Sequence, residues 1–199
     1  MDLNYNSIPL FPTIIHQFDV NGFSEIQDKL IDYAYDLKKR EPEGVKFSNY
    51  GGWQSPCFLL NNKDDLLQSF IINCLSNFPN IHTSINLNVD VWININKTGD
   101  YNEKHHHPNC NLAGVLWIKC PKDCGNIVFT SPCSFVNHQE VNSYVHEFKE
   151  KNNFFHTYLF TPTEGRMLVF PSHLLHKVDE NKSTEDRISV SFNITLIDG

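Results

Sequence analysis

The sequence has no long hydrophobic run: the longest, Leu112 to Ile118, is seven residues, whereas a membrane-spanning helix needs roughly 20. Its amino-terminal stretch lacks the basic region and the apolar segment of a secretory signal peptide. Basic residues are also few, because 16 Lys and Arg face 23 Asp and Glu and leave a formal charge of −7. These absences predict a cytoplasmic protein with no membrane partner. They also disfavour binding to duplex nucleic acid through overall charge.

The composition is typical of one folded domain. The chain has 199 residues, 40% hydrophobic and 20% charged, so it can bury a core without crosslinks, and we expect a single domain over residues 1–199. The six cysteines are then expected to be reduced thiols. Four of them cluster, at positions 110, 120, 124 and 133. They lack the paired C-x2-C spacing of zinc fingers, which makes a structural zinc site the weaker alternative.

Residues 1–80 carry helical patterns. Apolar residues recur at helical spacing over 25–37, with Ser24 as the expected N-cap and Pro42 beyond the end. A second helix is expected over 64–77, where apolar residues again gather on one face. This part of the chain therefore predicts helices that support a core formed by the rest.

From residue 84 onward the period changes to two. Residues 84–96 alternate apolar and polar side chains, which is typical of a half-buried strand. The polar stretch 137–152 is expected to be a loop or a short helix. Many short strands after a helical opening predict a mainly β fold of the α+β class, with residues 84–199 forming a jelly roll, or double-stranded β-helix, like that of cupins. The further strands are expected over 111–119, 125–130, 154–160, 165–170, 173–178 and 186–197.

A run of three histidines, His105 to His107, is the first candidate site. On a strand, residues two apart point to the same face, so His105 and His107 can bind one metal ion while His106 points away. Imidazole suits iron, zinc, copper and nickel. A solvated histidine-rich turn is the alternative. A third ligand would come from His173 or His176, and only one of them can face the site because they lie three apart on an extended strand.

Arg187 and Ser189 form a second candidate site. They lie two apart on an expected interior strand, and a buried arginine is rare without a partner. No acid lies on that face of the strand, so an external carboxylate would suit both the guanidinium and the hydroxyl. The alternative is an ion pair with Asp186 or Glu185 at the end of the strand.

In their order along the chain, these residues resemble the Fe(II)- and 2-oxoglutarate-dependent oxygenases, and most closely a group of bacterial and phage members. The order is a histidine motif, a distal histidine, and an Arg-x-Ser pair soon afterwards. The resemblance implies Fe(II), 2-oxoglutarate and O₂ as cofactor and co-substrates. It also implies hydroxylation of an unidentified small molecule or side chain, with release of succinate and CO₂. The motifs that carry it span nearly the whole chain: Phe11-Pro12, Gly51-Gly52-Trp53-Gln54-Ser55, Gly99-Asp100-Tyr101-Asn102, His105-x-His107-Pro108, Gly125-Asn126-Ile127-Val128-Phe129 and Phe170-Pro171-Ser172-x-Leu174-x-His176.

The resemblance makes His105 and His176 iron ligands. Position 107, where most of the superfamily has Asp or Glu, is His in this chain. Three imidazoles leave as many open positions on iron as two imidazoles and a carboxylate do. We therefore expect His105, His107 and His176 to form the metal site. His106 and Glu103 are the alternative ligands if the strand register differs.

The resemblance also implies residues for the co-substrate and the substrate. Arg187, with Ser189, would bind the distal carboxylate of 2-oxoglutarate. Trp117 lies on the strand where the superfamily often places an aromatic ring beside the co-substrate, although core packing is the alternative for it. The residues that could meet the substrate are Asn94, Asn96 and Trp53.

Two other functions fit the same residues. One is a cupin-type metalloenzyme that uses three histidines without 2-oxoglutarate. The other is a jelly roll without enzymatic activity that binds a sugar or a protein and whose histidines hold zinc or no metal. The role of Arg187 separates the first of these from an oxygenase, and the identity of the bound metal separates the second.

Overall fold

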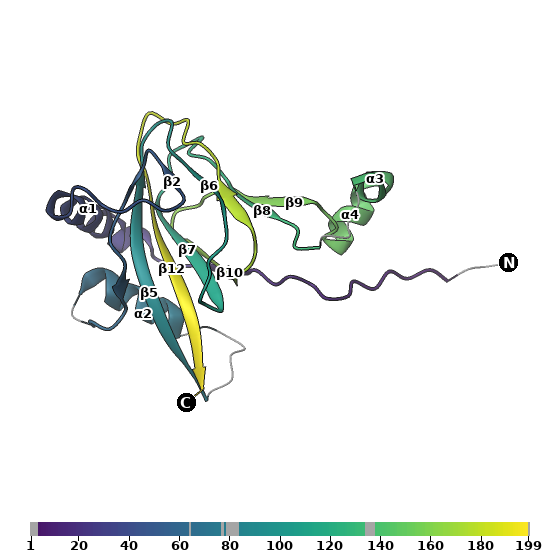
Figure 1. Cartoon of the computed structure of the whole chain (residues 1–199), viewed down its shortest axis with the longest axis horizontal. Helices are drawn as coiled ribbons and strands as arrows, with labels where there is room; N and C mark the ends of the chain where they lie inside the picture. Colours follow the sequence, from purple (N-terminus) through teal and green to yellow (C-terminus); the bar gives the residue numbers. More distant parts are fainter. Residues whose placement is uncertain (1–3, 64, 77, 79–83, 134–137, 199) are drawn as a thin grey trace.

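The computed structural model of the protein describes residues 4–63, 65–76, 78, 84–133 and 138–198, and it consists mainly of antiparallel strands (Figure 1). The larger sheet has the order β1 (His16–Asp19), β10 (Arg166–Pro171), β7 (Leu112–Lys119), β12 (Arg187–Asp198), β5 (Ile85–Asn96) and β3 (Trp53–Gln54), and β4 (Phe58–Leu59) also pairs with β5. The smaller sheet has the order β2 (Asn49–Tyr50), β6 (Tyr101–His105), β11 (His176–Val178), β8 (Ile127–Thr130) and β9 (Thr157–Phe160). Neighbouring strands such as β5 and β12 are far apart in sequence, as in a jelly roll. The predicted mainly β, double-stranded β-helix fold is confirmed.

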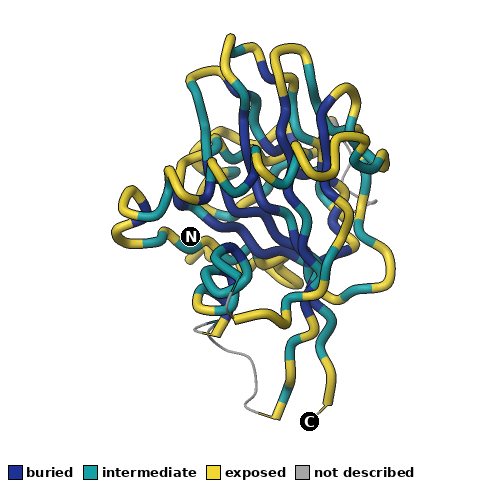
Figure 2. The backbone as a smooth tube through the Cα atoms, turned by 90° about the vertical axis from the view of Figure 1, so that its left-hand side faces the viewer, coloured by how far each residue is buried: buried dark blue, intermediate teal, exposed yellow. Residues whose placement is uncertain are grey.

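The inner faces of the two sheets pack against each other. Strands β7 and β10 of the larger sheet and β8 of the smaller sheet contribute to one buried cluster between them. Its members on these strands are Ala113, Val115, Trp117, Ile127, Phe129, Leu168 and Phe170. The segments that carry the most buried residues run through the middle of the molecule (Figure 2).

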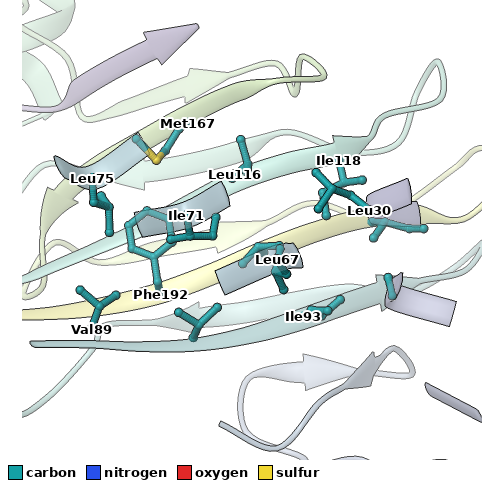
Figure 3. Packing of buried hydrophobic residues seen from close by; sticks show 14 of the residues in the cluster. Leu30, Leu67, Ile71, Leu75, Val89, Ile93, Leu116, Ile118, Met167 and Phe192 are labelled. Atoms are coloured by element: carbon teal, nitrogen blue, oxygen red, sulfur yellow. The ribbon is translucent and has the colours of Figure 1, made fainter. Parts of the chain in front are cut away.

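Two helices cover the outer face of the larger sheet. Helices α1 (Ser24–Arg40) and α2 (Leu66–Ser76) lie on one side of the long strands β5 and β12, with the smaller sheet on the other side (Figure 1). Leu67, Ile71 and Leu75 of α2 share a buried cluster with Val89 of β5 and Phe192 of β12 (Figure 3). Burying one such side chain contributes about 1.5–3 kcal/mol. The helices therefore act as the support that the sequence predicts.

The alternation of β12 sorts its side chains between the two faces of the larger sheet. Ile188, Val190 and Phe192 belong to the cluster beneath the helices. Because successive side chains of a strand point to opposite faces, Arg187 and Ser189 point to the inner face, toward the smaller sheet. The same rule applied to β5 brings its polar residues to the inner face as well.

The predicted N-cap of α1 is wrong. Ser24 is the first residue of the helix rather than its cap, and Phe23 occupies the cap position without a side-chain hydrogen bond. Phe23 is buried and packs near Phe70 of α2, with ring centroids 6.0 Å apart. The packing of Phe23 therefore sets where the helix begins. Its end matches the expectation, because the helix stops at Arg40, ahead of Pro42.

The remaining boundaries differ from the predictions only in detail. The helix expected over 64–77 is observed as α2, and its two outermost predicted positions lie outside the described residues. The strand expected over 173–178 begins only at His176, because Leu174 N–H donates to Pro171 O at 3.0 Å and closes a turn before it. The sequence does not predict strands β1 to β4. The strand expected to carry both His105 and His107 is β6, which ends at His105.

The polar stretch 137–152 contains two short helices, α3 (His138–Ser143) and α4 (His146–Asn152), which lie beyond β9 and away from the sheets (Figure 1). Its first residue lies outside the described residues. Helix α4 is followed by Asn153, whose left-handed backbone angles end the helix. None of the helices in the described part of the chain is long and apolar enough to cross a membrane.

Candidate metal and carboxylate site

Three histidines meet beside the inner face of the larger sheet. His105 ends β6 and lies directly across from His176, the first residue of β11. His107 follows β6, and its backbone N–H donates to Ser172 O at 2.9 Å, which holds this segment beside the turn that precedes β11. One ligand nitrogen from each of the three rings lies within 4.8 Å of the other two. The structure therefore brings together His105, His107 and His176.

An oxygen acceptor fixes the proton on each ring. His105 and His176 donate from Nδ1 to backbone carbonyls two residues earlier in the chain, at 2.7 and 2.8 Å. His107 donates from Nδ1 to the side-chain Oδ1 of Asn193, at 2.7 Å. Since a carbonyl oxygen only accepts, each Nδ1 carries the proton and each Nε2 keeps a lone pair.

The electrostatics of the cluster suit a bound cation. Burial lowers the pKa of His107 to about 4 and the pKa of His176 to about 3, and it lowers the pKa of His105 as well. The rings are therefore uncharged at neutral pH. Nε2 of His107 lies 3.3 Å from Nε2 of His176, so two lone pairs face each other. A cation satisfies both of them, and three neutral imidazoles are a donor set that suits Fe(II).

The alternative ligands do not take part. His106 and Glu103 are exposed, and so is His173, which lies in the turn before β11. None of the three belongs to the group of potential ligands found among the described residues. Of the two distal histidines, only His176 joins the site, as the spacing of three predicts.

Arg187 is buried with one end of its guanidinium unpaired. Its side chain is 1% exposed, and Nη1 donates to the backbone carbonyls of Cys124 and Asp179. Nη2 has no hydrogen-bond partner among the described residues. Burial lowers the pKa of Arg187, but an arginine in a protein stays protonated. A buried cation with a free donor is costly unless an anion completes it, which a carboxylate would do.

The alternative for Arg187, an ion pair with Asp186 or Glu185 at the end of the strand, does not form. Asp186 accepts a hydrogen bond from Tyr35 Oη at 2.9 Å. Glu185 pairs instead with Lys119, at 2.9 Å. Both acids next to Arg187 are therefore occupied elsewhere, which leaves its Nη2 available to a ligand.

Polar side chains extend the site along the inner face of β12 and its neighbours. Ser189 is buried and lies opposite Trp117 of β7 and Asn94 of β5 in the strand register. Trp117 is 1% exposed and belongs to the cluster between the sheets. Asn94 Nδ2 donates to Ser191 Oγ at 3.0 Å, and the side chain of Asn96 lies against Gly52. Four of the predicted residues thus lie on the inner face of the larger sheet, three of them polar.

Trp53, which the sequence offers as a residue that could meet the substrate, does not lie on this face. Its ring belongs to the cluster beneath the helices, where Lys38 Nζ lies 6.0 Å from the ring centroid. Its Nε1–H donates to Glu41 O at 2.9 Å. Because strand residues alternate, it is the next residue, the buried Gln54, that points toward the site.

Three residues near the site are not identified by the sequence patterns. Asn193 holds His107, and the period of two along β12 could have placed it on the face of Arg187 and Ser189. Ser48, whose hydroxyl lies 3.4 Å from His105 Nε2, gave no signal because the short strand β2 beside it was not predicted.

The third is Asn181, which is completely buried in the turn before β12. Its Nδ2 donates to the backbone carbonyls of Asn96 and Glu185, and its Oδ1 accepts from the backbone N–H of Ser183 at 2.9 Å. These bonds fix the turn that leads into Arg187. In the sequence it reads only as a turn residue.

Among the residues that the structure describes, the clustered cysteines do not converge as metal ligands. All six cysteines are free thiols, and none belongs to a potential metal-binding group within the described ranges. Cys124 is buried beside Arg187 and Cys120. The hydrogen bond from Cys120 and the charge of Arg187 lower the pKa of Cys124.

Two stacked antiparallel sheets that hold three convergent, uncharged imidazoles and a buried arginine define a metal-binding protein of the double-stranded β-helix class. The sequence identifies the family within this class, because the family described as "Putative 2OG-Fe(II) oxygenase" matches residues 90–193, more than half of the chain. The protein belongs to this family of 2-oxoglutarate- and Fe(II)-dependent oxygenases, whose cofactor and co-substrates are Fe(II), 2-oxoglutarate and O₂. The three histidines and the free donor of Arg187 fit these groups.

Solved structures share this fold. A prolyl-4-hydroxylase from Pseudomonas putida superposes with a TM-score of 0.62 at 11% identity, over 92% of each chain. The viral collagen prolyl hydroxylase of Paramecium Bursaria Chlorella virus-1, in complex with 2-oxoglutarate, has a TM-score of 0.54 at 16% identity, over 90% of this chain and 94% of that one. HygX from Streptomyces hygroscopicus, with nickel and 2-oxoglutarate bound, has a TM-score of 0.53 at 8% identity, over 92% and 82%. No curated protein matches the sequence.

Proposed function

We propose that this protein is a dioxygenase that hydroxylates a C–H bond of its substrate and converts 2-oxoglutarate to succinate and CO₂. One atom of O₂ would enter the substrate and the other the succinate. The observation that carries this proposal is Arg187, a buried guanidinium with a free Nη2 on the inner face of the larger sheet. A guanidinium buried with a free donor is costly, and an anionic co-substrate would offset that cost.

One set of residues would bind the metal, and another would bind the co-substrate. His105, His107 and His176 would hold Fe(II) through Nε2, and bound Fe(II) supplies the redox chemistry with O₂. Arg187 would bind the distal carboxylate of 2-oxoglutarate through Nη2, and the hydroxyl of Ser189 would add a hydrogen bond. These two residues orient the oxoacid so that its other end can reach the metal.

Residues around the co-substrate would exclude water from it and contact the substrate. Trp117, opposite Ser189 in the sheet, would form an apolar wall that excludes water from the oxoacid. Asn94 lies on the same face and would offer hydrogen bonds to a polar substrate or to the oxoacid. Asn96 is held more tightly, since its side chain packs under Gly52 and its carbonyl accepts from Asn181, so it would shape the wall of the site.

Anaerobic binding followed by aerobic turnover tests the proposal. Protein purified without a histidine tag is loaded with Fe(II) and titrated with 2-oxoglutarate under nitrogen, and the charge-transfer absorption of the complex is recorded. Air is then admitted and succinate is measured. We expect both the absorption band and succinate formation. The absence of both would refute the proposal and favour a three-histidine metalloenzyme that does not use 2-oxoglutarate, or a binding protein.

A further inference from the structure

His107 differs from the other two histidines in what holds it. The Nδ1–H groups of His105 and His176 donate to backbone carbonyls two residues earlier, acceptors that the chain offers whatever the neighbouring side chains are. His107 instead depends on the side chain of Asn193, which comes from β12, at an Oδ1 to Nδ1 distance of 2.7 Å. This is the only one of the three ligands whose proton position is set by another side chain.

Aromatic neighbours confine the same ring. Trp92 of β5 stacks on His107 with ring centroids 5.8 Å apart and an angle of 25° between the planes. Phe170 of β10 meets it edge-on at 6.4 Å. These contacts limit how the ring can tilt, but they do not fix which nitrogen carries the proton or which nitrogen faces the metal site. The hydrogen bond to Asn193 fixes both.

We propose that Asn193 is a positioning residue that holds His107 as a neutral metal ligand with Nε2 toward the ion. The inference rests on the proposed function of the three histidines as a metal site. It explains how a histidine can serve at position 107 in place of the usual carboxylate. An aspartate there has no ring N–H to donate to Asn193 Oδ1, so the hydrogen bond seen here belongs to the histidine. Asn193 and His107 therefore act as a pair.

The pairing makes a specific prediction for metal affinity. In Asn193→Ala the ring of His107 can rotate or move its proton to Nε2, and either change removes the ligand lone pair. Replacing the hydrogen-bond partner behind a metal-bound histidine typically costs 10–100-fold in affinity. We expect a loss of about that size when Co(II) or Fe(II) is titrated anaerobically into the apoprotein without 2-oxoglutarate. We also expect a changed Co(II) visible spectrum. Asn193→Asp keeps an acceptor and should restore affinity to within a few-fold of the wild type.

A double-mutant cycle with His107→Ala separates positioning from a general structural role. In the His107→Ala background, which leaves Asn193 no partner at position 107, Asn193→Ala should leave the remaining Co(II) affinity nearly unchanged, because the interaction it removes is already gone. Ser191→Ala is the matched control on the same face of β12: Ser191 accepts from Asn94, and the change should leave metal affinity at the wild-type value. If Asn193→Ala does not fold, Asn193→Ser serves instead, since its hydroxyl is too short to reach His107.

The outcomes are distinct. Wild-type Co(II) affinity in Asn193→Ala, or an equal loss in both backgrounds, would overturn the inference. The readout is metal binding alone, so the test stands apart from that of the proposed function. If the wild type binds Co(II) but shows neither 2-oxoglutarate binding nor succinate, the oxygenase proposal fails while the role of Asn193 is still decided by the cycle. If the wild type binds no metal, both fail.

Discussion

The rings of His107 and His176 lie nearly parallel, at 6° to each other, with their Nε2 atoms 3.3 Å apart. Neither nitrogen carries a proton, because both Nδ1 atoms donate to oxygen acceptors. Two lone pairs at this distance repel each other unless a positive charge lies beside them. The packing of β6, β11 and β12 therefore enforces a geometry that a divalent cation stabilises.

This geometry predicts that His176 and His173 behave differently, although they lie three residues apart. His176→Ala removes a converging Nε2 and should weaken Co(II) binding by at least about 100-fold, since losing a ligand should cost no less than losing the partner behind it. His173→Ala removes an exposed ring of the preceding turn and should leave the affinity unchanged. Anaerobic Co(II) titration of both variants is the measurement. Equal losses would show that the histidine-rich region binds metal without this geometry.

Arg187 should control 2-oxoglutarate without affecting the metal. Arg187→Lys keeps the charge but loses the planar fork, and truncating a buried, hydrogen-bonded charge pair costs 2–5 kcal/mol, so the Kd of 2-oxoglutarate should rise by roughly 30-fold or more. Co(II) affinity without 2-oxoglutarate should stay the same. Arg166→Ala is the matched control, because Arg166 pairs with Asp19 at 2.7 Å on the partly exposed edge of the sheet. Unchanged 2-oxoglutarate binding in Arg187→Lys would contradict the assigned role.

The sequence predicts the long elements well because their patterns are long. Strand β5 alternates over twelve residues, and the structure reproduces that strand within one residue of the prediction. Strands of two residues, such as β2 and β3, carry no period that could be read, and they form because β5 and β6 present free edges to them. These short strands also affect the site, because without β2 and β3 the sequence gives neither the face on which Trp53 lies nor the place of Ser48 beside His105.

The site itself could be predicted only in part for a related reason. A spacing of two places His105 beside His107, and another places Arg187 beside Ser189, but neither says which distant strand supplies the third ligand. That pairing, His105 across from His176, is a property of the sheet topology, and the resemblance to a family supplied it. The same alternation along β12 could have identified Asn193, because it lies on the face of β12 that carries Arg187.

Trp53 and Trp117 provide a test of which face of the larger sheet carries the function. Trp53→Phe removes the Nε1–H donor to Glu41 O and part of a packed ring, so it should lower the free energy of unfolding by about 1–3 kcal/mol and leave 2-oxoglutarate binding intact. Trp117→Phe alters the inner face opposite Ser189 and should weaken 2-oxoglutarate binding. Thermal unfolding and anaerobic titration of each variant separate the two effects. A Trp53→Phe variant with normal stability and weakened 2-oxoglutarate binding would reverse the assignment.

Tyr35 of α1 predicts how stability depends on alkaline pH. Burial, and then the hydrogen bond to Asp186, raise the pKa of Tyr35 from 10.0 to about 12. In this range the folded protein keeps a proton that the unfolded chain has lost, so unfolding becomes easier as the pH rises. The stabilisation is present in full below pH 10 and is lost as the pH approaches 12. Tyr35→Phe has no proton to lose, so its free energy of unfolding, measured with urea at several pH values, should decline less steeply than that of the wild type over this window. Parallel curves for the two proteins would show that the hydrogen bond from Tyr35 to Asp186 does not raise the tyrosine pKa. Tyr35 would then not couple α1 to the residue that precedes Arg187.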